Sequence, residues 1–363
     1  MKWLLILLSS FLIMSACGAR QHLEQQETKA TKENYYGYQL EKKDELKRIS
    51  LATIGEERVI NVPDFVKSLN GEYQYDPIHR TLKIEIGEDI YKFIYGVPVI
   101  EKNGVYLPIN NIELFVVEEN IYLPLNFLRI VLGLDIRYGS EGDVFYEWDE
   151  SALVTNSSYF NLIEEEEWTV NSMIDYLGFL TKPIEGAKVS TIPNHLPGAK
   201  RAYRNGYHEG IDWYAYASGQ HISTTTPVYA MAEGVIVRAD HDYQEYVSQE
   251  NRNQDLHLTV KLGETPEYIF DRLRGRQVWV QYDKGVMNRF AHLDSIPEDI
   301  KVGDVVNSST VIGYVGNSGT SGAVKKDGTQ LHLHQDILIY GELFWKPFSL
   351  EEVKIILQSV FGE

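Results

Sequence analysis

The middle of the chain contains short stretches in which apolar and polar residues alternate. Thr81–Ile86 alternates strictly, as expected for a strand with one buried face. Further short strands are expected at residues 90–98, 104–108 and 121–125. Residues 126–132 then have the length of a short helix, and Gly133 follows them as a helix stop. This pattern predicts a small α+β domain over residues 51–150.

After about residue 200 the pattern becomes mostly β. Apolar runs bounded by turn residues predict strands at residues 228–237, 257–262, 277–282 and 331–340. Glycine-rich turns, notably at residues 313–322, separate several of these runs. We therefore predict a mainly β domain with an antiparallel sheet over residues 201–345. Apolar residues at helical spacing over 350–360 predict a C-terminal helix within 346–363.

Residues 151–200 are expected to form a helical connector between these two domains. The stretch 151–180 has helical character and contains an acidic run at residues 164–167. Carboxylates are favoured near a helix N-terminus, so this run fits a solvated first helical turn better than a metal site. Prolines and glycines after residue 180 indicate a loop.

The N-terminal 50 residues do not have the pattern of a folded domain. Lys2 precedes an apolar run of about a dozen residues that is too short to span a bilayer comfortably, so residues 1–16 are predicted to be a signal peptide. Residues 17–50 are polar and charged, which predicts a flexible tether with room for a short helix at residues 40–46.

The end of this apolar run carries a short recognisable motif. Met14-Ser15-Ala16-Cys17 resembles the lipobox of bacterial lipoproteins. That resemblance implies cleavage before Cys17, whose sulfur would receive a diacylglyceryl group and so anchor the chain by two acyl chains. It places the protein outside the cytoplasm, on the outer face of the cell membrane and facing the cell wall. The alternative is an uncleaved anchor with an incidental cysteine.

Composition narrows the range of partners. The chain has 363 residues, of which 44% are hydrophobic, which is enough to bury real cores and excludes wholesale disorder. Its formal net charge is −18, so we expect neither nucleic acid nor an anionic membrane as a charge-driven partner. Cys17 is the single cysteine, which rules out an intrachain disulfide.

Candidate chemistry lies after residue 200, where seven of the ten histidines are found. The segment His208-Glu209-Gly210-Ile211-Asp212 places an imidazole and a carboxylate four residues apart. On a helix they would share a face, and on an extended chain Gly210 would allow a bend that brings both to one metal ion. Both groups are good zinc ligands, although such a pair alone arises by chance in many proteins.

Two further histidine elements follow. His332 and His334 alternate with leucines in a strand pattern, so both imidazoles are predicted to face the same side. The alternative is two histidines on a solvated sheet face. His292, in the segment RFAHL, would by itself be an ordinary core or surface histidine.

Taken in order, these elements resemble the lysostaphin-type or LytM-type peptidases of family M23. The resemblance covers about residues 200–345, and its flanking segments are RFAHLDSI, Gly303-Asp304-Val305, IGYVGNSGTSG and LHLHQDI. It implies one zinc ion per chain. The implied ligands are His208, Asp212 and His334. The implied catalytic residues are His292 and His332, with the division of roles between them left open.

The chemistry of zinc is consistent with these implied roles. Three protein ligands leave a fourth position for water, whose pKa the metal lowers toward ~7. The chain lacks H-E-x-x-H, so a glutamate base of that type is not expected. One neutral imidazole can orient the water or accept its proton, and another can stabilise the oxyanion. The usual glutamate after the H-x-H pair is Asp336 here, which keeps the carboxylate.

Residues 240–276 depart from the M23 pattern, because they resemble an insertion between two strands that lie closer together in typical members. His241 and His257 lie in this insertion and are expected at the surface rather than on a metal. The insertion could border the substrate groove and alter specificity.

The N-terminal domain carries a looser resemblance. The segment IYLPLNFLRIVLGLDIRYGSEGDVFYEW resembles the stalk-like module first named from the N-terminus of copper amine oxidases. That resemblance implies a non-catalytic spacer or wall-contacting domain and no copper chemistry. His79 lies here without partners at ligand spacing and is interpreted as structural or as a surface residue.

Three hypotheses about function follow. The leading one is a zinc endopeptidase that cuts peptide stems or cross-bridges of peptidoglycan beside the membrane to which it is anchored. The second is a latent or non-catalytic family member that binds cell wall or regulates other wall hydrolases. Such members usually lack a site residue, and this chain keeps all five. The third is a structural spacer whose function resides in residues 51–150.

Overall fold

The computed structural model describes residues 45–140, 142–148 and 168–362. The chain divides into two compact units, Met1–Leu46 and Lys47–Glu363, and nearly all described residues belong to the second. The predicted signal peptide, Cys17 and the acidic run at residues 164–167 lie outside the described residues.

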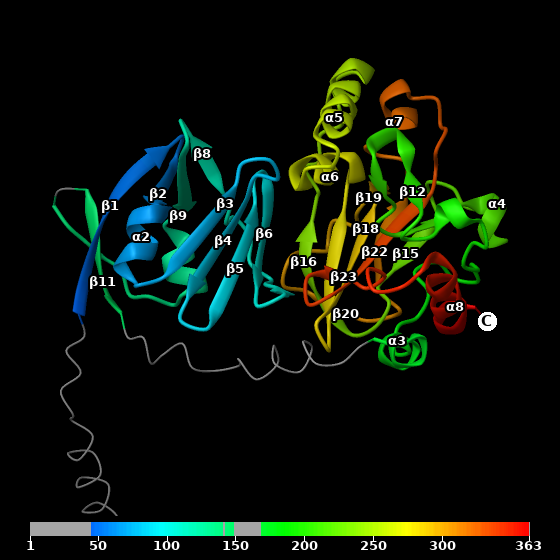
Figure 1. The fold of residues 1–363 in the computed structure, drawn as a ribbon, viewed down its shortest axis with the longest axis horizontal. Helices are drawn as coiled ribbons and strands as arrows, with labels where there is room; N and C mark the ends of the chain where they lie inside the picture. The colour runs from blue at the N-terminus through cyan, green and yellow to red at the C-terminus, as the bar shows by residue number, and fades with distance from the viewer. Residues whose placement is uncertain (1–44, 141, 149–167, 363) are drawn as a thin grey trace, which may run out of the picture. The chain divides into compact units, whose positions relative to one another are not determined.

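Residues 45–148 form two antiparallel sheets. A six-stranded sheet has the order β10-β11-β1-β2-β9-β8, and a five-stranded meander runs β3-β4-β5-β6-β7 (Figure 1). The strands of the first sheet are β1 (Glu45–Ile54), β2 (Glu57–Asn61), β8 (Phe115–Val117), β9 (Asn120–Pro124), β10 (Arg137–Tyr138) and β11 (Asp143–Trp148). The strands of the meander are β3 (Glu72–Asp76), β4 (Thr81–Ile86), β5 (Asp89–Ile94), β6 (Val97–Lys102) and β7 (Val105–Tyr106).

One buried aromatic residue organises the core of this region. Phe127 lies in η1 (Phe127–Val131), a single π-helical turn at the predicted short helix, and Gly133 follows with φ +66°. The Phe127 ring makes edge-to-face contacts, at centroid distances of 5.5–5.8 Å, with Phe65, Tyr91 and Phe93. Phe65 comes from α2 (Val62–Ser68), whose first turn is capped by the Asn61 side chain. The α+β character predicted for this region is confirmed.

One prediction at the edge of this region was wrong. The segment 40–46 was given room for a short helix, but Glu45–Leu46 open strand β1, and residues 40–44 lie outside the described part. Strand β1 also includes residues 45–50, which were predicted as part of the tether, and it pairs along Leu51–Ile54 with β2.

The C-terminal region, residues 168–362, is also built mainly on antiparallel sheets. Its main sheet has the order β14-β22-β18-β17-β16-β20, with β23 paired to β22. These strands are β14 (Ile211–Trp213), β16 (Gly234–Ala239), β17 (Val278–Tyr282), β18 (Val286–Ala291), β20 (Val305–Val306), β22 (Leu333–Ile339) and β23 (Glu342–Leu343). Two smaller sheets contain β12 (Lys200–Arg201) with β13 (Gly206–Tyr207), and β15 (Pro227–Tyr229), β21 (Val311–Val315) and β19 (Leu293–Ser295).

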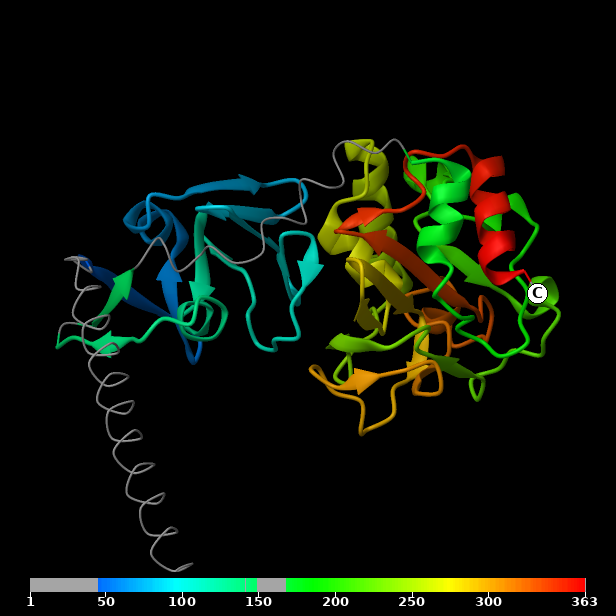
Figure 2. The ribbon, with the colours of Figure 1, turned by 90° about the horizontal axis from the view of Figure 1, so that it is seen from below.

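Helices flank this main sheet. Figure 2 shows α3 and α8 side by side, in agreement with their packing contacts. The α-helices are α3 (Val170–Leu177), α4 (Ala215–Ser218), α5 (Gln249–Leu262), α6 (Glu267–Arg274), α7 (Ser321–Lys325) and α8 (Leu350–Phe361). The 3-10 turns are η4 (Pro193–His195) and η5 (Ala202–Arg204). The predicted C-terminal helix is confirmed in α8, which buries Val353, Ile356 and Leu357.

The strand predicted at residues 257–262 was wrong, because these residues form the last turns of α5. The Ser248 side chain accepts a hydrogen bond from the Asn251 backbone at the helix N-terminus, and Gly263 (φ +78°) caps its C-terminus. These two caps delimit a helix whose polar sequence has almost no apolar periodicity. Alternation over six residues was therefore the weaker signal.

The run predicted as one strand at residues 228–237 is divided between two. β15 and β16 belong to different sheets, and the chain turns at residues 230–233 between them. The strands predicted at 277–282 and 331–340 are β17 and β22. A mainly β C-terminal region with antiparallel sheets is therefore confirmed. Within the described ranges, no helix has the length and apolar character needed to cross a membrane.

Candidate metal and catalytic site

Pairing between β14 and β22 brings distant candidate residues together. Asp212 on β14 stands directly opposite His334 on β22. Gly210 lies just before β14, where a Cβ atom would stand 2.2 Å from the carbonyl oxygen of Gln335. Glycine is therefore needed for the close approach of the two segments, and the bend of the chain allows His208 to reach the same point.

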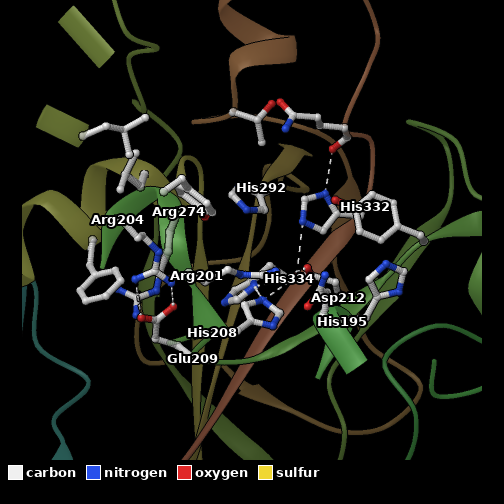
Figure 3. Close-up of a pocket in the computed structure, with 18 of the residues that line it drawn as sticks. His195, Arg201, Arg204, His208, Glu209, Asp212, Arg274, His292, His332 and His334 are labelled. Atoms are coloured by element: carbon white, nitrogen blue, oxygen red, sulfur yellow. Dashed lines mark hydrogen bonds and ion pairs between the residues drawn. The ribbon is translucent and has the colours of Figure 1, made fainter. Parts of the chain in front are cut away.

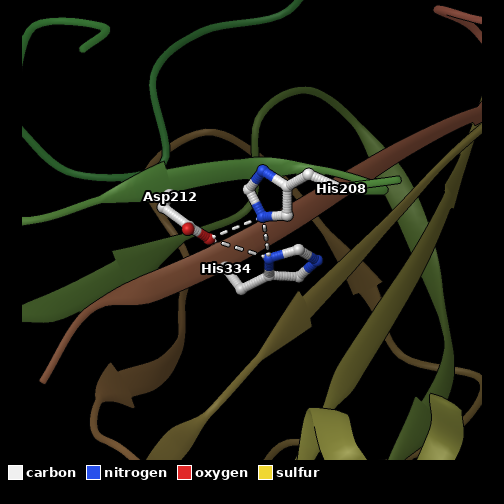
Figure 4. A group of neighbouring side chains, drawn as sticks. All are labelled: His208, Asp212 and His334. Atoms are coloured by element: carbon white, nitrogen blue, oxygen red, sulfur yellow. Dashed lines mark hydrogen bonds and ion pairs between the residues drawn. The ribbon is translucent and has the colours of Figure 1, made fainter. Parts of the chain in front are cut away.

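Three donor atoms from these residues converge (Figure 4). His208 Nε2 lies 3.0 Å from Asp212 Oδ1 and 3.2 Å from His334 Nδ1, and the last two atoms are 2.9 Å apart. All three side chains are buried, and together they could hold a metal ion. Tetrahedral zinc ligands about 2.0–2.1 Å from the metal stand about 3.3 Å apart, so small outward shifts would accommodate the ion.

The remaining nitrogen of each imidazole has a fixed partner. His208 Nδ1 lies 3.1 Å from the backbone oxygen of Leu196, and His334 Nε2 lies 2.7 Å from Asp336 Oδ1. Both oxygens can only accept, so these nitrogens donate, and the opposite nitrogen of each ring faces the shared point. Such outer partners orient metal-binding histidines.

Asp336 belongs to a buried charged network. Its Oδ2 atom lies 2.9 Å from Arg274 Nε, and Arg289 Nη1 is 3.8 Å away. Burial raises the pKa of the Asp336 carboxyl, but Arg274 and His334 outweigh burial and hold that pKa far below its usual range. The residue is thus a carboxylate able to polarise His334. Sequence alone had indicated only that a carboxylate was kept here.

Electrostatics of the three convergent side chains fits a cation. Burial alone would lower the pKa of His334, but the carboxylates of Asp336 and Asp212 raise it to about 9. In the metal-free chain the proton on Nδ1 is donated to Asp212, where a metal ion would take its place. Burial raises the pKa of Asp212, yet His208 and His332 hold it well below its ordinary value. The donor set, two imidazoles and a carboxylate, suits zinc.

The two other predicted histidines stand beside this group. The ring centroid of His292 lies 4.7 Å from that of His332 and 5.7 Å from that of His334. His332 Nε2 is 3.5 Å from Asp212 Oδ1. The five residues predicted from sequence therefore come together, and their side chains line one pocket (Figure 3).

Backbone oxygens also set the orientation of these two rings. His292 Nδ1 lies 2.7 Å from the Ser318 oxygen, and His332 Nδ1 lies 2.7 Å from the Gln330 oxygen. Each Nδ1 donates, which leaves Nε2 with a lone pair in the neutral ring. Burial lowers the pKa of His292 well below its ordinary value, and His332 and His334 lower it further. His292 is thus a neutral acceptor, held at φ +59°, an unusual backbone conformation for a side chain of this size.

An aromatic stack that sequence reasoning missed supports His332. The Tyr214 ring lies parallel to His332, 4.3 Å between centroids and 8° between planes. Tyr216 stacks on Tyr214, and its hydroxyl contacts His195 Nε2 at 3.0 Å. Tyr214 follows Asp212 by two residues, so strand periodicity could have placed it on the same face. His195 ends the 3-10 turn η4 in a proline-rich segment, where no spacing signal pointed to it.

A cavity of about 440 Å³ opens over this group. Figure 3 shows Arg201, Arg204 and Arg274 gathered beside the convergent ligands. Arg201 Nη2 lies 3.2 Å from Asp212 Oδ2, so it neutralises the oxygen that faces away from the shared point. The pocket is large enough for a few residues of an extended peptide.

Segment 240–276 lies between β16 and β17, folds into α5 and α6, and contacts the site. The Gly319 N–H donates to Glu245 Oε2 at 2.8 Å, and Arg252 Nε donates to the Gly319 oxygen at 2.9 Å. Gly319 adjoins Ser318, whose backbone oxygen orients His292. The insertion therefore holds the turn that positions a candidate catalytic ring.

The remaining candidate histidines stay apart from the site. His241 and His257 are exposed, and His241 Nε2 contacts the Ile300 oxygen at 2.7 Å. His79 lies 3.3 Å from Glu264. None of them lines the pocket, in agreement with their predicted surface or structural roles.

With this geometry established, the family of the domain can be stated. Residues 206–343 match the model of Peptidase family M23, so the chain contains an M23 peptidase domain over that range. The match includes all five histidine and aspartate residues predicted to form the site. A comparison with curated proteins found no match.

Several solved structures are similar to the chain at low identity. LytU is 21% identical over 42% of this chain and 74% of its own, with a TM-score of 0.26. The catalytic domain of lysostaphin from Staphylococcus simulans is 20% identical over 49% and 90%, with a TM-score of 0.23. A chain of the SpoIIIAH–SpoIIQ complex is 18% identical over 46% and 95%, with a TM-score of 0.28. With TM-scores this low, we base no functional conclusion on these likenesses.

Proposed function

We propose that the chain is a zinc metallopeptidase that hydrolyses peptide bonds in the stems or cross-bridges of peptidoglycan. The observation that carries this proposal is the convergence of His208 Nε2, Asp212 Oδ1 and His334 Nδ1 within 2.9–3.2 Å of one another. The M23 family match supplies the peptidase class, and it supports peptidoglycan as the substrate.

The chain's own residues supply most of the proposed chemistry. A zinc ion, when bound, polarises a carbonyl group and makes water more acidic. His208, Asp212 and His334 would hold the ion. His292 and His332 each keep an acceptor Nε2 beside it, so one ring can take the water's proton and then, as a cation, donate to the developing oxyanion.

Digestion of purified peptidoglycan tests the peptidase directly. We expect new amino termini from the wild type and from His221→Ala, an exposed histidine outside the pocket, but not from His334→Ala. Zinc content, measured in parallel, should be near one ion per chain in the first two proteins and much lower in the third. A wild type that binds zinc without cleaving any wall peptide would contradict the peptidase and favour a latent or regulatory family member.

We also propose that the protein is exported and lipid-anchored through Cys17. Detergent phase partitioning of the protein from a producing bacterium tests this anchor. The wild type should enter the detergent phase, whereas Cys17→Ala should remain in the aqueous phase or keep an uncleaved leader. Equal partitioning of two mature proteins would contradict the anchor without touching the peptidase proposal.

Residues 51–150 are proposed to act as a non-catalytic spacer. All five candidate site residues lie in the C-terminal region, and none of the residues that line the site's pocket comes from the N-terminal sheets. The spacer would set the reach of the peptidase from the membrane into the wall.

A further inference from the structure

Helices α5 and α6 build one side of the pocket over the convergent ligands. Arg252 and Leu256 on α5, with Phe270 and Leu273 on α6, all line that cavity. Arg252 and Leu256 are four residues apart in one helix, so their side chains lie on the same face. A ligand in this cavity would therefore contact both a guanidinium group and an apolar surface.

The charge of Arg252 differs from that of the other arginines in the pocket. Arg201, Arg204 and Arg274 each lie within 3.2 Å of a carboxylate oxygen of the protein. Arg252 Nε donates to the Gly319 oxygen, and among the described residues no carboxylate forms an ion pair with its guanidinium. Its two terminal nitrogens are therefore free to bind a ligand, held in place by the bond through Nε.

We propose that Arg252, with Leu256, Phe270 and Leu273, forms a subsite for a substrate residue that carries a free carboxylate on an aliphatic stem. This inference rests on the proposed peptidase function and narrows its substrate class. A guanidinium fork matches a carboxylate in shape and charge, and the apolar side chains would contact the stem. A cross-bridge made of glycine alone would satisfy neither element.

The net charge of the chain strengthens this argument. The protein carries −18, so most of its surface repels an acidic peptide. An arginine without a carboxylate partner, beside a site built for a metal cation, makes the pocket a local exception. An acidic wall peptide would thus be drawn to the site rather than to the surface around it.

A matched pair of substrates tests the subsite. Cross-linked wall peptides with free carboxylates on their acidic residues are compared with the same peptides in amidated form, using the zinc-loaded full chain in detergent. We expect the wild type to favour the free acid by about tenfold or more in kcat/KM, since charge-assisted hydrogen bonds are the stronger ones. Arg252→Gln should reduce this ratio to near one through KM, while loss of its bond to the Gly319 oxygen should lower kcat equally for both substrates. Arg252→Lys should keep part of the ratio.

Arg272→Gln is the control for damage to the insertion. Arg272 lies on α6 and pairs with Asp255 outside this pocket, so its loss should leave the free-acid preference unchanged. A purely structural role of Arg252 would weaken cleavage of both substrates equally and leave their ratio intact. That result, or a wild type indifferent to amidation, would overturn the subsite.

Binding measurements separate this inference from the peptidase itself. Calorimetry with both peptides gives the free-acid to amide affinity ratio even if the wild type cleaves neither. If the wild type cleaves neither peptide but binds the free acid more tightly, and this preference depends on Arg252, the proposed function is contradicted and the subsite is supported. Cleavage without such a preference would keep the proposed function and overturn the subsite, and binding without it would also overturn the subsite.

Discussion

The two folded regions of the chain bury polar side chains to very different extents. Among described residues, the N-terminal region buries three polar or charged side chains, Asp89, Glu101 and Asp143, whereas the C-terminal region buries nineteen. The C-terminal region is about twice as long, so length alone does not explain the difference. Buried polar groups destabilise a fold unless they have hydrogen-bond or ion-pair partners. Such an excess therefore indicates a region in which polar groups serve a role other than stabilising the fold.

The partners in the C-terminal region form a continuous chain of alternating charge. Arg274 contacts Asp336, Asp336 contacts His334, His334 contacts Asp212, and Asp212 contacts Arg201, with distances of 2.7–3.2 Å. The N-terminal core, by contrast, rests on aromatic and aliphatic packing around Phe127. The comparison teaches that one region is built for stability and the other for holding charged groups in a fixed arrangement.

The largest expected effect separates the ligands from the catalytic rings. His292→Ala and His332→Ala should each lower kcat by about 10²–10⁴-fold, the usual contribution of acid–base groups, while the zinc content stays near that of the wild type. Hydrolysis rates and metal analysis on the same samples check this. If either variant lost its zinc, that ring would have to be reassigned as a ligand.

Phe127→Ala tests whether the N-terminal core carries stability and nothing else. Its truncation should destabilise that region by about 3–5 kcal/mol, as for other fully buried aromatic residues. Hydrogen exchange of the amides in β9 and η1 reports the loss, and zinc content and kcat should not change. Ile130→Ala, at a side chain 53% exposed, is the control and should shift stability by less than about 0.5 kcal/mol. A fall in kcat would show that the two regions are coupled.

Asp336→Asn removes the carboxylate behind His334 without changing its size. Zinc affinity should fall by about 10–100-fold, as for other outer partners of metal ligands, and excess zinc should restore hydrolysis. Competition with a fluorescent chelator measures the affinity. Asp299→Asn, at an exposed position, is the matched control. Unchanged affinity in Asp336→Asn would deny the charged network a role in metal binding.

The smallest expected effect concerns the insertion. The Glu245 carboxylate accepts a hydrogen bond from the Gly319 N–H. Glu245→Gln weakens this hydrogen bond and so loosens the turn behind His292. We expect kcat to fall by about two- to tenfold with zinc content unchanged. Glu250→Gln, in the exposed first turn of α5, should have no effect. Equal kinetics of the two variants would mean that the insertion does not position the ring.

Much of the site could be predicted because its candidate metal-binding and catalytic residues lie in short sequence segments. His208 and Asp212 are four positions apart with a glycine midway between them. His332 and His334 alternate with leucines in a strand pattern, so local spacing already restricted where these side chains point. Tyr214 and His195 were missed for opposite reasons. Tyr214 obeys the same strand spacing but has no metal-binding group, and His195 reaches the stack from a loop without periodicity.

The fold was less predictable where local signals conflicted. The segment at 257–262 alternates like a strand, but the caps at Ser248 and Gly263 make it the end of a helix. Arg252 and Leu256 lie before that segment in the same helix, where they share one face. Their contribution to the pocket could not be anticipated, because no local pattern shows which face of this helix packs over the site.

The sequence by itself determined which residue types were available, their order, and the M23 resemblance that connected them. Only the tertiary structure decided that Asp212 and His334, 122 positions apart, meet at 2.9 Å across β14 and β22. It also decided that Asp336 is held by Arg274 and that Arg252 lines the pocket with no carboxylate beside it. The physical reason is that sheet register and helix packing set contacts between distant segments, whereas local patterns constrain only residues a few positions apart.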